Sequence, residues 1–214
     1  MPYKLALFDF DGTLADSFPW FTTVVNDAAD KYGFRRVAPD EVDTLRGKSA
    51  REMIAYLGVK TWKLPFIASY MRKRKAQDLH TVKLFDGAAE TLRRLSDAGV
   101  TLAIVSSNTE PNIRTMLGAQ TSALIAHYEC GASMFGKARR FKAVLRAGGC
   151  GARDALCIGD ELRDLDSARA AGIPFGAVTW GYTHGAALRA QKPEHLFETF
   201  DELFDTIAGT TARS

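Results

Sequence analysis

The chain has 214 residues, 46% of them hydrophobic and 25% charged, a balance typical of a soluble globular protein with a sizeable core. Its net charge of +3 is too small to indicate nucleic-acid binding, and no apolar run reaches the roughly 18 residues of a membrane span. The start lacks a signal-peptide pattern and the three cysteines lack metal-ligand spacing, so we expect a cytoplasmic protein with free thiols.

Short apolar runs predict the buried strands of a parallel sheet. In chain order they are residues 4–10, 100–107, 155–160 and 174–180, with a weaker run at 123–129. Helical patterns that end in glycine lie between them, at residues 87–99, 137–149 and 162–172. This alternation predicts an α/β fold with a doubly wound, Rossmann-like parallel sheet.

Residues 16–82 break this alternation. They hold helical stretches at 19–33, 39–47, 49–58 and 64–80, and no convincing strand. A connection of about 65 residues is too long for a simple crossover. We therefore expect an α-helical cap domain at 16–82, inserted into a core domain of residues 1–15 and 83–214. Its basic run at 71–75 is interpreted as a solvated helix face.

Polar side chains follow several of the predicted strands, and ligands bind beyond the carboxyl ends of parallel strands. The first strand leads into Asp9, Asp11, Gly12 and Thr13, and the second into Ser106, Ser107 and Asn108. The third leads into Asp160 with Asp164 close behind, and Lys137 begins a helix. The sequence thus gathers carboxylates, hydroxyls and an ammonium group at one edge of the sheet.

This set of groups indicates a definite chemistry. Carboxylates from separate loops form an oxygen-rich site that suits Mg²⁺, and the metal offsets their mutual repulsion. A lysine and a hydroxyl can hold phosphate oxygens. One carboxylate can attack phosphorus, and another two residues along the chain can transfer a proton.

Each residue also has a plain structural explanation. Asp11 and Gly12 form a common turn pair, Asp160 could cap a helix, and Lys137 could be a solvated lysine. Independent structural roles do not readily put all these groups at successive strand ends. Taken together, they favour a functional site.

Four stretches carry a family resemblance, which spans residues 4–15 and 83–205. They are "DFDGT" (9–13), "LAIVSSN" (102–108) with Ser106, "FGKARRFKAVL" (135–145) with Lys137, and "IGDELRD" (158–164). In this order they resemble the signature motifs of the haloacid dehalogenase superfamily, in its phosphatase branch. The insert at 16–82 sits where the helical cap of that family sits.

The resemblance implies a role for each matching residue. Asp9 is expected to be the nucleophile and Asp11 the general acid and base, with Ser106 and Lys137 on the phosphate. Mg²⁺ is expected on Asp9, Asp160 and the backbone carbonyl of Asp11, with Asp164 on or beside the metal. Further substrate contacts are expected from Gly12, Thr13, Ser107, Asn108 and, in the cap loop "LRGKSARE" (45–52), Arg46, whose guanidinium suits a substrate carboxylate.

The expected protein is a Mg²⁺-dependent phosphatase, similar to phosphoglycolate phosphatases, that hydrolyses a small phosphorylated metabolite and acts as a monomer or homodimer. Two alternatives stay open: a phosphomutase of the β-phosphoglucomutase type, and a non-catalytic regulator that binds phosphate. Dehalogenation is disfavoured because Asp11 is present and that reaction needs no such leaving-group acid.

Overall fold

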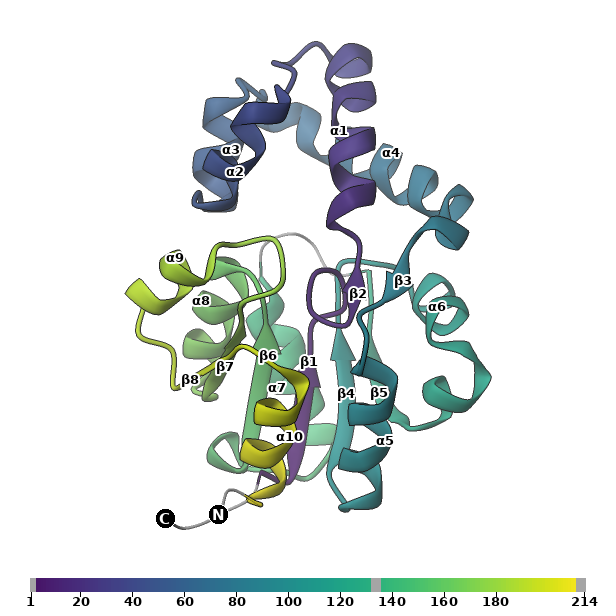
Figure 1. The fold of residues 1–214 in the computed structure, drawn as a ribbon, viewed down its shortest axis with the longest axis vertical. Helices are drawn as coiled ribbons and strands as arrows, with labels where there is room; N and C mark the ends of the chain where they lie inside the picture. Colours follow the sequence, from purple (N-terminus) through teal and green to yellow (C-terminus); the bar gives the residue numbers. More distant parts are fainter. Residues whose placement is uncertain (1–2, 132–135, 211–214) are drawn as a thin grey trace.

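The computed structural model describes residues 3–131 and 136–210, and a parallel sheet lies at its centre (Figure 1). Six strands form this sheet in the described residues: β1 (Leu5–Phe8), β4 (Thr101–Val105), β5 (Ile125–Glu129), β6 (Ala155–Gly159), β7 (Phe175–Val178) and β8 (His195–Phe197). Their order is β5-β4-β1-β6-β7-β8, and every neighbouring pair is parallel. The predicted α/β fold with a Rossmann-like parallel sheet is confirmed.

Helices cover both faces of the sheet because side chains alternate along each strand. In β1, Ala6 and Phe8 join one apolar cluster, whereas Leu5 and Leu7 join the other. The first cluster packs against α5 (Ala88–Asp97), α6 (Glu110–Ala123) and α10 (Phe200–Ala208). The second packs against α7 (Lys137–Ala147), α8 (Leu162–Ala171) and α9 (Gly185–Ala190). Burial on both faces explains why the four central strands, β1, β4, β6 and β7, are almost continuous apolar runs.

A second group of helices lies beyond one end of the sheet (Figure 1). We call them the cap helices: α1 (Phe18–Tyr32), α2 (Val42–Arg46), α3 (Ala50–Tyr56) and α4 (Leu64–Gln77). Short 3₁₀ turns lie beside them at Pro39–Glu41, Thr61–Lys63 and Leu79–Thr81, and another precedes β6 at Ala152–Asp154. The cap helices have a small apolar cluster of their own around Val25, Leu45 and Leu57.

Two chain segments connect the cap helices to the sheet. They pair as a short antiparallel ribbon of β2 (Ala15–Asp16) and β3 (Lys83–Leu84). The ribbon therefore brings both crossings side by side, next to the residues that follow β1. The division into a cap domain of 16–82 and a core domain of 1–15 and 83–214 stays a prediction.

Candidate active site

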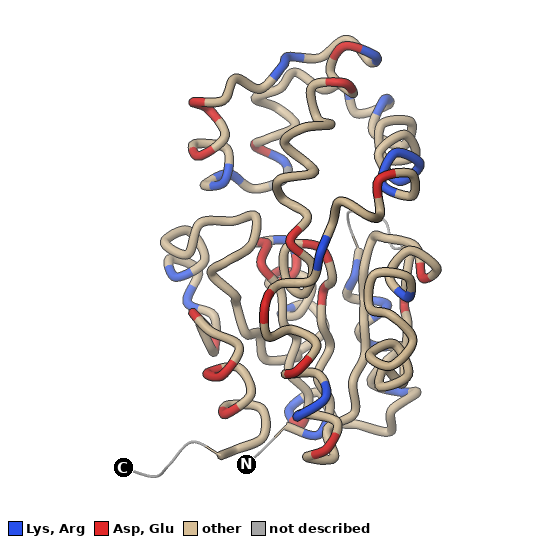
Figure 2. The backbone as a smooth tube through the Cα atoms, turned by 45° about the vertical axis from the view of Figure 1, so that its right-hand side comes forward, with Lys and Arg blue, Asp and Glu red and all other residues tan. Residues whose placement is uncertain are grey.

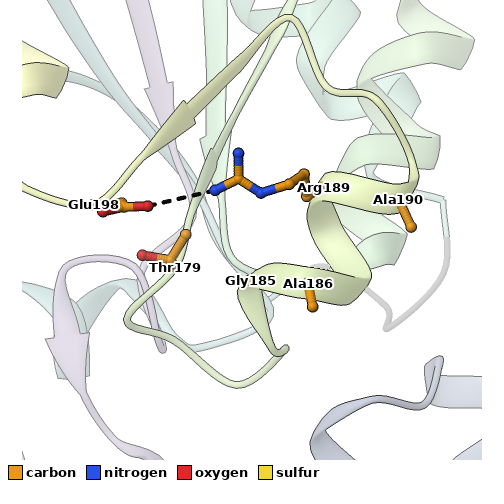
Figure 3. A pocket seen from close by; sticks show the side chains of 6 residues that line it. All are labelled: Thr179, Gly185, Ala186, Arg189, Ala190 and Glu198. Atoms are coloured by element: carbon orange, nitrogen blue, oxygen red, sulfur yellow. Dashed lines mark hydrogen bonds and ion pairs between the residues drawn. The ribbon is translucent and has the colours of Figure 1, made fainter.

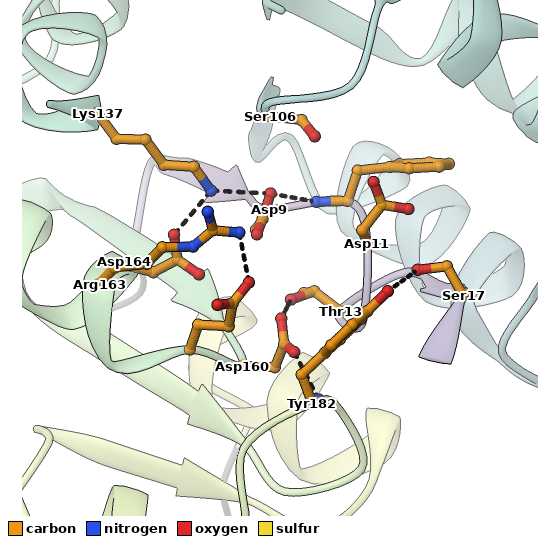
Figure 4. A network of polar contacts seen from close by, with 12 residues as sticks. Asp9, Asp11, Thr13, Ser17, Ser106, Lys137, Asp160, Arg163, Asp164 and Tyr182 are labelled. Atoms are coloured by element: carbon orange, nitrogen blue, oxygen red, sulfur yellow. Dashed lines mark hydrogen bonds and ion pairs between the residues drawn. The ribbon is translucent and has the colours of Figure 1, made fainter. Parts of the chain in front are cut away.

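The ends of three neighbouring strands bring the predicted site residues together. Asp9 directly follows β1, Ser106 follows β4 and Asp160 follows β6, and β4 and β6 flank β1 in the sheet. Because these strands are parallel, their carboxyl ends share one edge, which faces the cap helices, and acidic positions gather there (Figure 2). Figure 4 shows these side chains with Lys137, the first residue of α7, around a common space.

The site concentrates charge in a buried place. Asp9, Asp160, Asp164 and Lys137 are each at most 5% exposed to solvent. One oxygen from each of the three aspartates lies within 4.8 Å of the others. Buried carboxylates this close repel one another, so the cluster needs compensating positive charge.

Lys137 supplies part of that charge. Its Nζ lies 2.9 Å from Asp9 Oδ1 and 2.7 Å from Asp164 Oδ1. Burial alone would lower the pKa of Lys137, but Asp164 and Asp9 outweigh it and raise this pKa above its usual value. Burial would likewise raise the pKa of Asp9, but Lys137 and Arg163 outweigh it and lower this pKa. Lys137 and Asp9 therefore form a charged pair at neutral pH.

Asp160 has no such cationic partner among the described residues. Its Oδ1 accepts a hydrogen bond from Thr13 Oγ1 at 2.9 Å, and its Oδ2 accepts one from the Tyr182 amide at 2.7 Å. Burial and the neighbouring carboxylates raise the pKa of Asp160 well above its usual value. In addition, Asp164 Oδ2 is buried without a hydrogen-bond partner. Acceptor oxygens in excess of donors fit a hard divalent cation such as Mg²⁺.

Asp11 lies at the boundary between the sheet and the cap helices. Its carboxylate forms an ion pair with Lys75 of α4, and Asn108 Nδ2 lies 3.4 Å from its Oδ2. Lys75 is 6% exposed, and its Nζ lies 5.2 Å from the ring centre of Trp20. The interpretation of residues 71–75 as a solvated helix face is therefore wrong for Lys75, although Lys73 on the same helix is exposed.

The residues after β4 form a tight polar turn. Ser106 is fully buried, and its Oγ accepts a hydrogen bond from the Asn108 amide at 3.1 Å. Asn108 is also buried, and its Oδ1 accepts from the Thr109 amide, whereas Ser107 is half-buried. The turn thus brings Ser106 and Asn108 to the same edge as Asp9 and Asp11.

Gly12 and Thr13 pack against Asp160. Gly12 has a φ of +80°, and a Cβ added there would lie 2.2 Å from Asp160 Oδ2, so only glycine fits. Thr13 is buried, and its carbonyl accepts a hydrogen bond from Trp180 Nε1 at 3.0 Å. These two residues therefore support the Asp160 carboxylate from the β1 side.

Arg46 ends α2, and its guanidinium points toward the residues that follow β7. Its Nη2 donates to the Gly181 carbonyl at 2.7 Å, and its Nε donates to the Tyr182 carbonyl at 3.2 Å. The structure thus brings Arg46 to the turn beside Asp160. That Arg46 holds a substrate carboxylate stays a prediction.

Tyr182 is a site residue that the sequence analysis did not identify. Its amide contacts Asp160, and its hydroxyl lies 3.0 Å from Ser17 Oγ (Figure 4). The signal was present, because Tyr182 lies shortly after β7 and the strand-end rule applies to that strand too. Lys75 carried no comparable signal, since it is simply the last residue of the basic run at 71–75.

A separate pocket lies where the chain leaves β7 and enters α9 (Figure 3). It is lined by Thr179, Gly185, Ala186, Arg189, Ala190 and Glu198. Arg189 and Glu198 form an ion pair of 3.4 Å across it, and none of the predicted site residues lines it.

Among the helices in the described ranges, none is long and apolar enough to cross a membrane.

Known proteins resemble this chain over most of its length. A phosphoglycolate phosphatase from Synechococcus elongatus is 30% identical over 202 residues, which cover 94% of this chain and 95% of the relative. A phosphoglycolate phosphatase from Pseudomonas aeruginosa is 24% identical, with 94% of this chain and 78% of the relative covered.

Solved structures share the fold. A haloacid dehalogenase-like family hydrolase from Streptococcus pneumoniae aligns with a TM-score of 0.76 at 22% identity, covering 94% of this chain and 96% of that one. CbbY from Rhodobacter sphaeroides, solved in complex with phosphate, aligns with a TM-score of 0.71 at 21% identity over 94% and 96% of the two chains.

The family itself follows from the sequence match. The family model described as haloacid dehalogenase-like hydrolase matches residues 6–178, a range that includes Asp9, Ser106 and Asp160. Together with a relative that is 30% identical over nearly the whole of both chains, this match confirms the resemblance drawn from the motifs. The chain belongs to the haloacid dehalogenase-like hydrolase family.

Proposed function

We propose that this hydrolase is a Mg²⁺-dependent phosphatase that cleaves a small phosphorylated metabolite through an aspartyl-phosphate intermediate. One observation carries the proposal: a buried cluster of Asp9, Asp160 and Asp164, compensated on one side by Lys137 and rich in acceptor oxygens on the other. The names of the relatives support phosphoglycolate as the first substrate to test.

Asp9 is proposed as the nucleophile. Lys137 Nζ lies 2.9 Å from its Oδ1, and the Phe10 amide donates to the same oxygen at 2.8 Å. These contacts orient the carboxylate, so we assign the attack to Oδ2. A bond forms between Oδ2 and phosphorus while the bond from phosphorus to the ester oxygen breaks.

Asp11 is proposed to move the proton in both steps. In its protonated form it gives the proton to the departing ester oxygen, so that an alcohol leaves. It then takes a proton from the water that attacks the phosphorus of the aspartyl-phosphate, which releases phosphate and restores Asp9. Lys75 and Asn108 contact this carboxylate and keep it at the boundary with the cap helices.

Mg²⁺ is proposed to bind Asp9, Asp160 and the backbone carbonyl of Asp11, with Asp164 Oδ2 on or beside it. When bound, it would offset the negative charge of the phosphoryl oxygens. Lys137 Nζ and Ser106 Oγ are proposed to hold the remaining phosphoryl oxygens. The surrounding contacts are proposed to come from Gly12, Thr13, Ser107 and Asn108.

The cap helices bring two cations toward the site, Lys75 and Arg46, and either could bind a charged group of the substrate. A phosphate ester such as phosphoglycolate also carries a carboxylate, which a buried cation would stabilise. Lys75 is buried beside Asp11, whereas the Nε and Nη2 groups of Arg46 already donate to the carbonyls of Tyr182 and Gly181. We therefore propose Lys75 as the cap cation nearest the substrate and keep Arg46 as the second candidate.

The cytoplasmic location and the monomeric or homodimeric state stay predictions.

The experiment is a measurement of phosphate release from a panel of metabolites that includes 2-phosphoglycolate, with and without Mg²⁺. We expect Mg²⁺-dependent release of phosphate, and we expect Asp9→Asn to abolish it while the variant stays folded. Sugar-phosphate isomerisation that needs a bisphosphate activator would favour the mutase alternative. Phosphate binding without any turnover across the panel would favour the regulator.

A further inference from the structure

The turn after β7, residues 179–184, is packed directly against Asp160. A Cβ added at Gly181 would lie 2.2 Å from Asp160 Cβ, and the Tyr182 amide donates to Asp160 Oδ2 at 2.7 Å. Gly12, which follows β1, packs against the same carboxylate. Asp160 therefore cannot change position unless this turn moves with it.

The same turn is bound by the end of α2 in the cap. Arg46 Nη2 donates to the Gly181 carbonyl at 2.7 Å, and Arg46 Nε donates to the Tyr182 carbonyl at 3.2 Å. In return, the His184 amide donates to the Arg46 carbonyl at 3.1 Å. Three hydrogen bonds thus hold α2 and the turn together.

One peptide group has a contact on each side. The Gly181 carbonyl, which accepts from Arg46, and the Tyr182 amide, which donates to Asp160, belong to the same planar unit. In a trans peptide these two groups point in opposite directions, so orienting one orients the other. A cation at the carbonyl also polarises the amide and strengthens its hydrogen bond.

The Tyr182 side chain ties the turn to α1 as well. Its hydroxyl lies 3.0 Å from Ser17 Oγ, the residue that precedes α1 (Figure 4). Its ring meets the rings of Phe18 and Phe21 edge-on, with centroids 5.1 and 5.6 Å apart. The turn therefore contacts both α1 and α2 while it holds Asp160.

We infer that Arg46 is a positioning residue that couples docking of the cap helices to Mg²⁺ binding at Asp160. The inference rests on the proposed function, because it takes Asp160 as a metal ligand. Coupling of this kind is reciprocal: docked cap helices favour Mg²⁺ binding, and bound Mg²⁺ favours docking. Arg46 acts through the Gly181–Tyr182 peptide and needs no contact with substrate.

The test is calorimetric titration with Mg²⁺ alone, without substrate, on wild type, Arg46→Met and Arg72→Met. Methionine keeps an unbranched chain but removes the donors, and Arg72 is an exposed cap arginine that serves as the control. We expect Arg46→Met to weaken Mg²⁺ binding about fivefold or more, and Arg72→Met to leave it unchanged. Equal dissociation constants for wild type and Arg46→Met would overturn the inference.

Two further readouts separate this inference from its alternatives. If Arg46→Met keeps wild-type Mg²⁺ affinity and loses activity only on acidic phosphate esters, Arg46 binds a substrate carboxylate instead. If wild type itself binds no Mg²⁺, the proposed metal site fails and the coupling with it.

A measurement on wild type alone covers the case in which Arg46→Met does not fold. Hydrogen exchange of the His184 amide, whose acceptor is the Arg46 carbonyl, should slow when Mg²⁺ is added. An exchange rate that does not respond to saturating Mg²⁺ would contradict the coupling.

Discussion

Lys75 and Asp11 lie 64 positions apart in the chain, yet they form an ion pair between the cap helices and the sheet. The lysine side chain is 7% exposed and the aspartate 21%, so water screens the pair only partly. Loss of one partner leaves the other charge poorly solvated, which costs about 2 kcal/mol or more. At the scale of single residues, this pair is the most informative contact beyond the motifs.

Because Lys75 is also the cap cation proposed to lie nearest the substrate, Lys75→Met should lower kcat/KM, and a loss of that size in transition-state stabilisation corresponds to roughly thirtyfold. Lys73→Met, an exposed change on the same helix, is the matched control and should behave like wild type. The measurement is steady-state kinetics on the best substrate of the panel. Equal kcat/KM values for the two variants would show that the ion pair has no part in turnover.

At the scale of elements, the turn after β7 is as important as the strand ends that carry the motifs. Gly181 shows why, because a methyl group there would overlap Asp160 although the backbone has no unusual φ. Gly181→Ala should destabilise the fold by about 1–3 kcal/mol through overpacking and should raise the Mg²⁺ requirement.

Gly151→Ala provides the control for that change. Its added Cβ would meet its nearest atom, Asp154 Oδ2, at an ordinary 3.7 Å. Thermal denaturation and a Mg²⁺ titration of activity compare the two variants. If Gly181→Ala melts and responds to Mg²⁺ like Gly151→Ala, the contact between the turn and Asp160 is not tight in solution.

The buried strands were predictable because a strand covered on both faces must be apolar throughout. The runs at 4–10, 100–107 and 155–160 contain β1, β4 and β6. In contrast, β8 (His195–Phe197) is a short edge strand with a half-buried histidine, and no pattern distinguishes it from a loop. The β2–β3 ribbon has two residues on each side, too few for any periodicity.

The candidate site could be predicted as far as it depends on strand order. Asp9, Ser106 and Asp160 lie close together because β1, β4 and β6 are neighbours in the sheet. The motifs predicted that these three residues share one site. The contacts of Lys75 and Arg46 depend on how the cap helices dock on the sheet, which no local pattern encodes. Tyr182 lay within reach of the strand-end rule, but its aromatic side chain gave no sign of a polar role.

At the scale of the whole molecule, the proposed metal site predicts that the stability of the fold depends on Mg²⁺. A cation that binds only the folded state stabilises it, by about 2.7 kcal/mol at a concentration one hundred times its dissociation constant. Mg²⁺ should therefore raise the Tm of wild type and not that of Asp160→Ala.

EDTA should abolish activity. Ca²⁺ should bind but restore activity poorly, because its larger and less regular coordination shell disturbs the in-line geometry of phosphoryl transfer.

The control for that prediction is the chelated protein itself. Without Mg²⁺, Asp160→Ala should lower the Tm less than an ordinary change from a large to a small buried side chain does. The reason is that it also removes one of three mutually repelling carboxylates. Thermal denaturation with and without Mg²⁺ measures both effects. If Mg²⁺ does not change the wild-type Tm and full activity persists after chelation, the enzyme does not need a metal and the proposed metal site is wrong.

The covalent intermediate on Asp9 is the central claim, and Asp11→Asn allows the most direct measurement of it. With an aryl phosphate whose leaving group needs no acid, the variant should still form the intermediate but hydrolyse it about 10²–10⁴-fold more slowly. Rapid quenching and peptide mass spectrometry should then find one phosphoryl group on Asp9, with a burst of about one aryl alcohol per enzyme. Turnover without a burst, and with Asp9 unmodified throughout, would contradict the mechanism.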